Sequence, residues 1–107
     1  MAIHKKEAFG AAEQELAAMA KALSHPARVA ILKELARRQS CVCGEIVEVM
    51  PLAQSTVSQH LKELLSAGLI KGTVDGVKSC YCINPAAFQR LESILTAFVS
   101  NTKEQCC

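Results

Sequence analysis

The feature that most constrains the fold is a change of hydrophobic period just past the middle of the chain. From Gln54 to Ala67, apolar residues recur every three or four positions, as on one face of a helix. Leu69 to Val74 and Val77 to Ile83 are instead short runs rich in β-branched residues, and the Asp75-Gly76 between them is a strong signal for a two-residue hairpin turn. Gly68 stands where a left-handed residue ends a helix. These patterns predict a helix followed directly by a β-hairpin.

The rest of the chain is predicted to be helical. A first helix is expected over residues 7–23, and it ends before Pro26, which suits the first turn of a second helix that runs to Arg38. Residues 39–43 form a short extended link, and 44–50 a brief third helix. A last helix begins at Asn84-Pro85 with a wide apolar stripe. The predicted fold class is mainly α with a small β-hairpin, a winged helix-turn-helix in the order ααααββα.

The chain is expected to be a single domain. Its 107 residues suit one winged-helix domain, with residues 100–107 as a flexible polar tail. The first residues lack the apolar stretch of a signal peptide, and no run approaches the length of a membrane span. We therefore expect a cytoplasmic protein without a membrane partner, in a compartment where thiols stay reduced.

The helix from Gln54 to Ala67 has an unusual polar face. A net charge of +2 is too weak to indicate nucleic-acid binding by itself. However, this helix presents short or amide-bearing side chains, which reach base edges and phosphates, where solvated helices prefer Glu and Lys. The simpler alternative is an amphipathic helix with a neutral polar face. The residues predicted to contact DNA here are Gln54, Ser55, Thr56, Ser58, Gln59, His60 and Lys62.

The hairpin favours the DNA-binding interpretation. A two-stranded sheet after a groove-reading helix is the wing of a winged helix, and its turn lies against the phosphate backbone or minor groove. Lys71 and Lys78 flank the tip and are natural phosphate partners. Taken one at a time, each is equally consistent with a solvated strand lysine.

Six cysteines fall in three pairs, and in a reducing compartment such pairs indicate metal or redox chemistry rather than a disulfide framework. Soft ions such as As(III), Sb(III), Cd(II) and Pb(II) prefer thiolate ligands. Cys41 and Cys43 lie two apart on extended chain, so both side chains can turn toward one ion. The start of the predicted third helix, just after them, favours the thiolate form.

Four segments together resemble the ArsR/SmtB family of metal-responsive repressors. They appear in order with the expected gaps, over roughly residues 15–100. The most specific part is the Ser-Thr-Val-Ser-Gln-His-Leu run. The matching segments are Leu23-Ser24-His25-Pro26-Ala27-Arg28, Cys41-Val42-Cys43-Gly44-Glu45-Ile46, Leu52-Ala53-Gln54-Ser55-Thr56-Val57-Ser58-Gln59-His60-Leu61 and Ala67-Gly68-Leu69-Ile70.

The resemblance implies a homodimeric winged helix whose first and last helices form the dimer interface. It implies binding to a double-stranded operator of dyad symmetry, and release when metal binds. The Cys-Val-Cys pair matches the sensor of arsenic-type members, which carries over to Cys41 and Cys43. Ala53 departs from the family, which often has Ser there as a helix cap.

A third thiolate must come from elsewhere, because Ile46 occupies the position where some members of the family have a further cysteine. Cys106-Cys107 is the candidate donor, and a three-thiolate site suits As(III). The alternatives are a two-coordinate site and solvent-exposed tail thiols.

Cys80 and Cys82 share one face of the second hairpin strand, opposite Tyr81 and Ile83, which are expected to pack inward. They are either a second soft-ion or redox pair, or small hydrophobic residues.

Paired cysteines also occur in three other kinds of protein. A repressor of the same fold with a thiol redox switch would respond to oxidant instead of metal. A metal-sequestering thiol protein would not explain the polar face of the helix from Gln54 to Ala67. A thiol oxidoreductase is disfavoured because the chain has no Cys-x-x-Cys and no βαβ unit around the pairs. No nucleophile-base pair or phosphate loop is recognisable, so the chain is not expected to be an enzyme.

Overall fold

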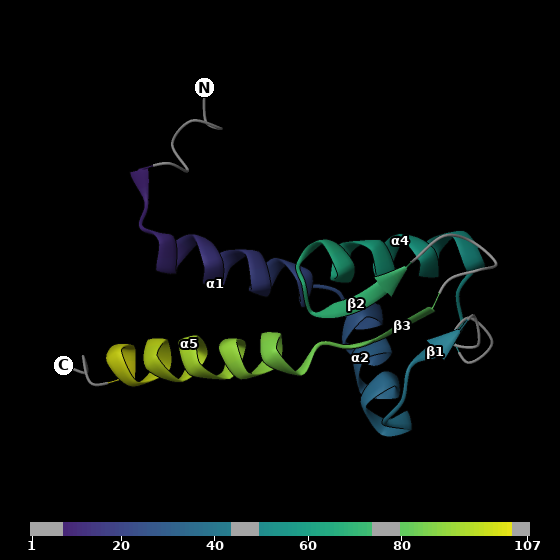
Figure 1. Ribbon diagram of the computed structural model, residues 1–107. Helices are drawn as coiled ribbons and strands as arrows, with labels where there is room; N and C mark the ends of the chain where they lie inside the picture. Colours follow the sequence, from purple (N-terminus) through teal and green to yellow (C-terminus); the bar gives the residue numbers. More distant parts are fainter. Residues whose placement is uncertain (1–7, 44–49, 74–79, 104–107) are drawn as a thin grey trace.

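Helices and a small antiparallel sheet follow one another in the predicted order (Figure 1). The computed structural model describes residues 8–43, 50–73 and 80–103. The fold class, mainly α with a winged helix-turn-helix, is confirmed. Within the described residues, the elements are α1 Ala11–Ala22, α2 Pro26–Arg38, β1 Val42–Cys43, α4 Gln54–Ser66, β2 Ile70–Thr73, β3 Cys80–Ile83 and α5 Pro85–Lys103.

The sheet has one strand more than the predicted hairpin. Its order is β1-β3-β2, and both pairings are antiparallel. The extra strand, β1, comes from the segment expected to be only an extended link. In this pairing Val42 lies opposite Tyr81. Both side chains are buried, at 2% and 1% exposure, and their burial stabilises the added strand. The link after α2 is therefore attached to the wing strand β3.

The core forms where α2, α4 and the sheet meet. The apolar positions at helical spacing in α2 and α4 supply most of its side chains, and alternate residues of the strands supply the rest. Burial of these large aliphatic side chains is the main stabilising term for a domain of this size. The largest fully buried side chains are Tyr81, Ile31, Leu35, Leu61, Leu64, Leu69, Ile70, Val42 and Val57.

The turn after α4 fixes the start of the wing. Gly68 has φ +82°, the left-handed conformation predicted for a residue that ends a helix. Its N–H donates to the carbonyl of Leu65 over 3.0 Å, and the next N–H, of Leu69, donates to that of Leu64 over 3.1 Å. Asn84 Nδ2 then donates to the Gly68 carbonyl over 2.9 Å. These bonds hold the end of α4, the start of β2 and the start of α5 together.

Gly72 allows β2 and β3 to approach closely. Its φ is +127°, and a Cβ there would clash with the carbonyl oxygen of Cys80 and lie 2.9 Å from the Cα of Tyr81. A side chain at this position would force the two wing strands apart, so glycine is required.

Some expectations fall at the edges of the described chain. Residues 100–103, expected in the polar tail, belong to α5, where Thr102 Oγ1 donates to the carbonyl of Phe98 over 3.0 Å. The predicted third helix lies outside the described residues except for Met50, and the hairpin tip at Asp75-Gly76 also lies outside them. Among the helices described, none combines the length and apolar character that a membrane crossing requires.

Candidate DNA-binding surface and cysteine cluster

The exposed side of α4 carries most of the polar residues expected to contact DNA. The opposite side of the helix holds Val57, Leu61 and Leu64 against the core, at 0%, 2% and 0% exposure. This anchoring turns a row of hydrogen-bonding side chains outward, on a helix of the length that a groove-reading helix needs. Of the seven candidates, Ser58 is half-buried, His60 is buried, and the exposed ones are Gln54, Ser55, Thr56, Gln59 and Lys62.

His60 is placed differently from the other candidates. It is 8% exposed, and its Nδ1 accepts a hydrogen bond from Nε of Arg28, on α2, over 3.2 Å. The ring of His25 lies beside it, with 4.4 Å between the ring centroids. The pKa of His60 is lowered from the ordinary 6.5, mainly because the ring is buried and to a smaller extent because of the nearby charges of His25 and Arg28. This position corrects our expectation, because His60 packs α4 against α2 and does not face outward.

His25 caps the second helix. It is the N-cap residue of α2, and its Nδ1 accepts a hydrogen bond from the Ala27 N–H over 3.0 Å. Such a cap satisfies one of the four backbone donors that a helix leaves unpaired at its start. The Ser-His-Pro sequence therefore fixes where α2 begins, and with it the position of Arg28.

The start of α4 has no such cap. Ala53 is its N-cap residue, with extended backbone, and no side chain of the described residues accepts a hydrogen bond from the first turn. The departure from the family pattern noted at Ala53 is thus a real difference in local structure. The first turn of α4 is less well fixed than a serine would make it.

The wing contributes one described cation. Lys71 is exposed on β2, where it is available to a phosphate. Lys78 was expected beside it, but it lies outside the described residues, as does the turn at the tip. Both stay candidates for DNA contact on the strength of their sequence positions.

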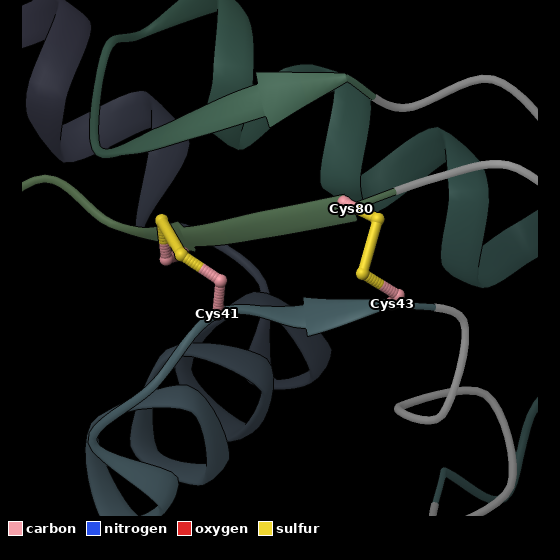
Figure 2. Close-up of a disulfide and its surroundings, with 4 residues drawn as sticks. Cys41, Cys43 and Cys80 are labelled. Carbon is pink, nitrogen blue, oxygen red and sulfur yellow. A yellow bond between two sulfur atoms is a disulfide. The ribbon is translucent and has the colours of Figure 1, made fainter.

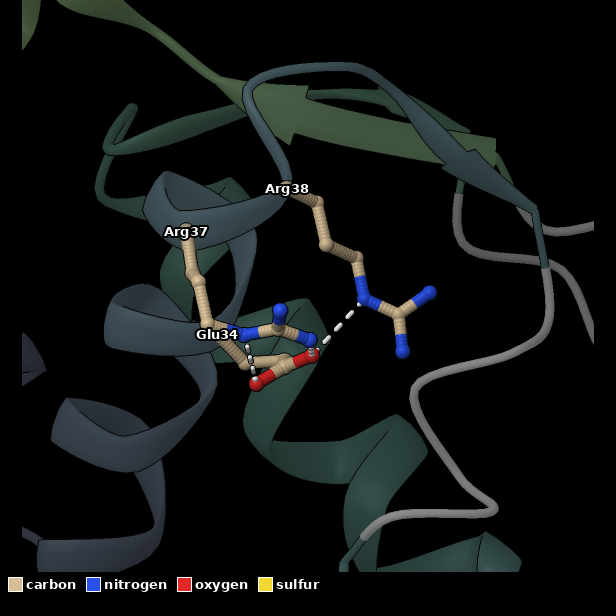
Figure 3. Close-up of polar contacts among 3 residues, drawn as sticks. All are labelled: Glu34, Arg37 and Arg38. Carbon is tan, nitrogen blue, oxygen red and sulfur yellow. Dashed lines mark hydrogen bonds and ion pairs between the residues drawn. The ribbon is translucent and has the colours of Figure 1, made fainter.

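Two further cations, at the end of α2, are already paired. Figure 3 shows Glu34 between Arg37 and Arg38, with hydrogen bonds from both guanidinium groups to its carboxylate. The hydrogen bonds from Arg37 and Arg38 lower the pKa of Glu34 from 4.5 to about 2. These arginines stabilise the last turn of α2, just before β1, and are not counted among the phosphate-binding candidates.

Four cysteines meet on one face of the sheet. Cys41 forms a disulfide with Cys82, and Cys43 forms one with Cys80, as Figure 2 shows. The Cα atoms are 4.3 Å apart in the first pair and 4.1 Å in the second. Cys41, Cys43 and Cys80 are exposed and Cys82 is half-buried. This cysteine cluster lies on the side of the strands opposite the buried Val42.

The sequence had marked both pairs of cysteines but had not joined them. The two Cys-x-Cys motifs share one pattern that could have indicated their pairing. Each is extended chain with a buried residue, Val42 or Tyr81, between its cysteines. The expectation that Cys80 and Cys82 lie opposite the inward Tyr81 is confirmed. Cys106 and Cys107, the expected third donors, lie outside the described residues.

The bonded cluster is not itself a metal site. With the sulfurs in disulfides, no group of three or more His, Cys, Asp or Glu side chains in the described ranges is placed to hold a metal ion. Thiolates are the ligands that soft ions prefer, so the donor set fits such an ion only in its reduced form.

Comparison with known proteins gives a consistent picture. A helix-turn-helix domain model matches residues 23–73. The arsenical resistance operon repressor of Bacillus subtilis (strain 168) is 36% identical over 90 residues, which cover 81% of this chain and 85% of that protein. The HTH-type transcriptional repressor SmtB of Mycobacterium tuberculosis (strain ATCC 25618 / H37Rv) is 41% identical over 61 residues, covering 57% of this chain and 44% of that protein.

Solved structures share the fold. The crystal structure of an ArsR family transcriptional regulator superposes with a TM-score of 0.71 at 23% identity, covering 89% of this chain and 96% of that one. Both of these relatives are named as transcriptional repressors. The matched sequence, the winged helix-turn-helix and the exposed polar face of α4 agree, and the chain belongs to the ArsR/SmtB family of DNA-binding transcriptional repressors.

Proposed function

We propose that this chain represses transcription as a homodimer and leaves its operator when a thiophilic ion binds Cys41 and Cys43. As(III) and Sb(III) are favoured, and Cd(II) and Pb(II) have the same preference for thiolates. One observation carries the proposal: Cys41, just before β1, and Cys43, in β1, are both exposed and lie on the same side of the chain, between α2 and the segment that leads to α4. Relatives named arsenical resistance operon repressors support the choice of As(III).

A three-coordinate ion needs another sulfur. Cys106 and Cys107 remain candidates, with their positions outside the described residues. Cys80 and Cys82 are further candidates, because each lies directly across from Cys43 or Cys41. Reduced thiolates would be the ligands of this site, and the ion would act only by binding to their sulfur atoms.

The position of β1 explains how an ion would act on the DNA-binding helix. β1 pairs with β3 through Val42 and Tyr81, and both side chains belong to the same core cluster as Val57 and Leu61 of α4. A shift of β1 that lets the sulfurs converge on an ion is therefore passed to the packing beneath α4. A coupling of about 1–3 kcal/mol would lower operator affinity roughly 5- to 150-fold.

The dimer is proposed to form through α1 and α5. These helices lie side by side and extend away from the sheet (Figure 1), joined by an ion pair in which Arg90 Nη2 lies 2.7 Å from Glu15 Oε1. Leu91 is the buried residue of α5, whereas Leu95, Phe98 and Val99 are 42%, 50% and 45% exposed. So much exposed apolar surface on one helix is typical of a surface covered by a second copy.

Fluorescence anisotropy of a labelled duplex from the chain's own upstream region tests the proposal. Reduced protein should bind it and be displaced by As(III) but not by Zn(II) at the same concentration. The Cys41→Ser/Cys43→Ser variant should bind the duplex with unchanged affinity and ignore As(III). If that variant is displaced as readily as the native chain, the site is wrong. If neither protein binds any upstream duplex, operator repression is wrong.

A further inference from the structure

The pairing of the cysteine cluster follows the register of the sheet. Cys43 lies opposite Cys80 in the β1–β3 ladder, and Cys41 and Cys82 are the next pair on the same face, with Cα atoms 4.3 Å apart. Cys41 and Cys43 therefore each have a different cysteine of β3 as their direct neighbour. Directly opposed residues on adjacent strands are the closest side-chain neighbours in a sheet, and diagonal ones are farther apart, at about 7–8 Å.

We propose that the wing cysteines Cys80 and Cys82 make this cluster a reversible two-disulfide switch that a hydroperoxide oxidises. The pairs formed are Cys41–Cys82 and Cys43–Cys80. Oxidation withdraws the thiolates from thiophilic ions, so that the repressor stays on DNA and no longer responds to As(III). The last statement rests on the proposed function, whereas the pairing itself does not.

The chemistry balances with one hydroperoxide for each pair. A thiolate attacks the O–O bond, so that its sulfur becomes a sulfenic acid and the peroxide leaves as an alcohol, or as water when the oxidant is hydrogen peroxide. The opposed thiolate then attacks the sulfenic sulfur, the S–S bond forms, and hydroxide leaves and is protonated to water. Each pair of thiols loses two electrons and two protons, and an added dithiol reverses the step by exchange.

Exposure and strand geometry together support this assignment. Three of the four cysteines are exposed, and the fourth is half-buried, so an oxidant in solution can reach the cluster. Both bonds join residues already opposed in the sheet, so oxidation requires no change of strand register. The core residues Val42 and Tyr81, on the other side of the strands, keep their places. We therefore expect the DNA-binding face of α4 to be unaffected by oxidation.

Matched double variants test the pairing. In a Cys106→Ser/Cys107→Ser background, Cys41→Ser/Cys82→Ser and Cys43→Ser/Cys80→Ser each leave one opposed pair. Cys41→Ser/Cys80→Ser and Cys43→Ser/Cys82→Ser each leave one diagonal pair, and each set of two variants replaces the same four cysteines. Free-thiol counts during titration with hydrogen peroxide should show disulfides forming at least tenfold faster in the opposed variants, on the order of one peroxide per bond. Equal rates in the two sets, or bonds mainly between chains, would overturn the proposal.

A second measurement addresses the consequence for DNA. The full native chain is reduced or oxidised, freed of reagent by gel filtration and bound to its upstream duplex. Reduced protein should be displaced by As(III), and oxidised protein should stay bound within about threefold of the reduced affinity. Release by peroxide alone, or unchanged release by As(III) after oxidation, would overturn the switch. If reduced protein also ignores As(III) while the opposed pairs still form, the ion-release function fails and the disulfide pairing stands.

Discussion

Nδ1 of His60, on α4, accepts a hydrogen bond from Nε of Arg28, on α2, over 3.2 Å. Arg28 also donates through Nη1 to the carbonyl of Lys21, at the end of α1, over 3.0 Å. One guanidinium group therefore joins three helices, and His60 must be neutral at Nδ1 to accept from it. Protonation of His60 at Nδ1 would therefore remove a hydrogen bond that joins α4 to α2.

The first prediction is that stability falls in mild acid. The folded pKa of His60 is lowered by burial and by the nearby charges of His25 and Arg28, so below the ordinary value of 6.5 the unfolded chain binds more protons than the folded one. His60 therefore contributes stability that is lost as the pH falls from that value toward the folded pKa. Glu34, whose pKa is about 2 instead of 4.5, titrates in a separate, lower window.

Urea midpoints measured between about pH 5 and 8 check this. The native midpoint should decrease toward pH 5, and His60→Gln, which cannot titrate, should have a flatter profile. A native profile as flat as that of the variant would show that His60 is not the group responsible.

The second prediction is that Ala53→Ser stabilises the protein. Ala53 is an uncapped N-cap residue with φ −67° and ψ 152°, the extended conformation from which a serine oxygen accepts an N–H bond of the first turn. We expect a gain of about 0.5–2 kcal/mol in the free energy of unfolding, measured by urea denaturation. Ala30→Ser, at an exposed position in the interior of α2, is the matched control and should be neutral or slightly destabilising. An equal effect of the two serines would argue against capping.

The third prediction concerns the dimer. Phe98, 50% exposed on α5, lies on the surface proposed to meet the second copy, so Phe98→Glu should place a charge in an apolar interface and produce monomers. Light scattering coupled to gel filtration measures the change. Gln89→Glu, on the opposite side of the same helix, adds the same charge and should leave a dimer. A dimer of unchanged stability in Phe98→Glu would place the interface elsewhere.

The fourth prediction separates base contacts from phosphate contacts. Gln59→Ala on α4 should weaken binding to the upstream duplex by about 1–3 kcal/mol and leave binding to unrelated DNA nearly unchanged. Lys71→Ala on the wing should weaken both alike and reduce the salt dependence by about one counterion per protomer. Anisotropy titrations at several salt concentrations distinguish the two patterns. A uniform loss for Gln59→Ala would make it a phosphate contact.

The helices and the wing were predictable because their signals are local. Hydrophobic spacing, the proline at the start of α2 and the glycine after α4 act within a few residues of where they stand. His60 shows the limit of listing polar residues on a helix, because it lies three positions after Val57 and next to Leu61, on the buried face. That spacing was the signal for its packing role.

The cysteine cluster was only half predictable. Each Cys-x-Cys marked extended chain with both sulfurs on one face, but which cysteines meet depends on pairing between β1 and β3. The bonded pairs are separated by 41 and 37 residues in sequence, and no local pattern specifies a register over that distance. The third strand was missed because a two-residue strand has too few side chains to show alternation.

The central claim is that capture of an ion by thiolates and docking on DNA oppose each other in one molecule. Linkage requires the effect to be reciprocal: if As(III) lowers operator affinity by a given factor, saturating operator must lower As(III) affinity by the same factor. The most direct measurement is the As(III) affinity of reduced native chain, with and without saturating upstream duplex. We predict that the duplex weakens As(III) binding roughly 5- to 150-fold. Equal As(III) affinity in the two states would contradict the account.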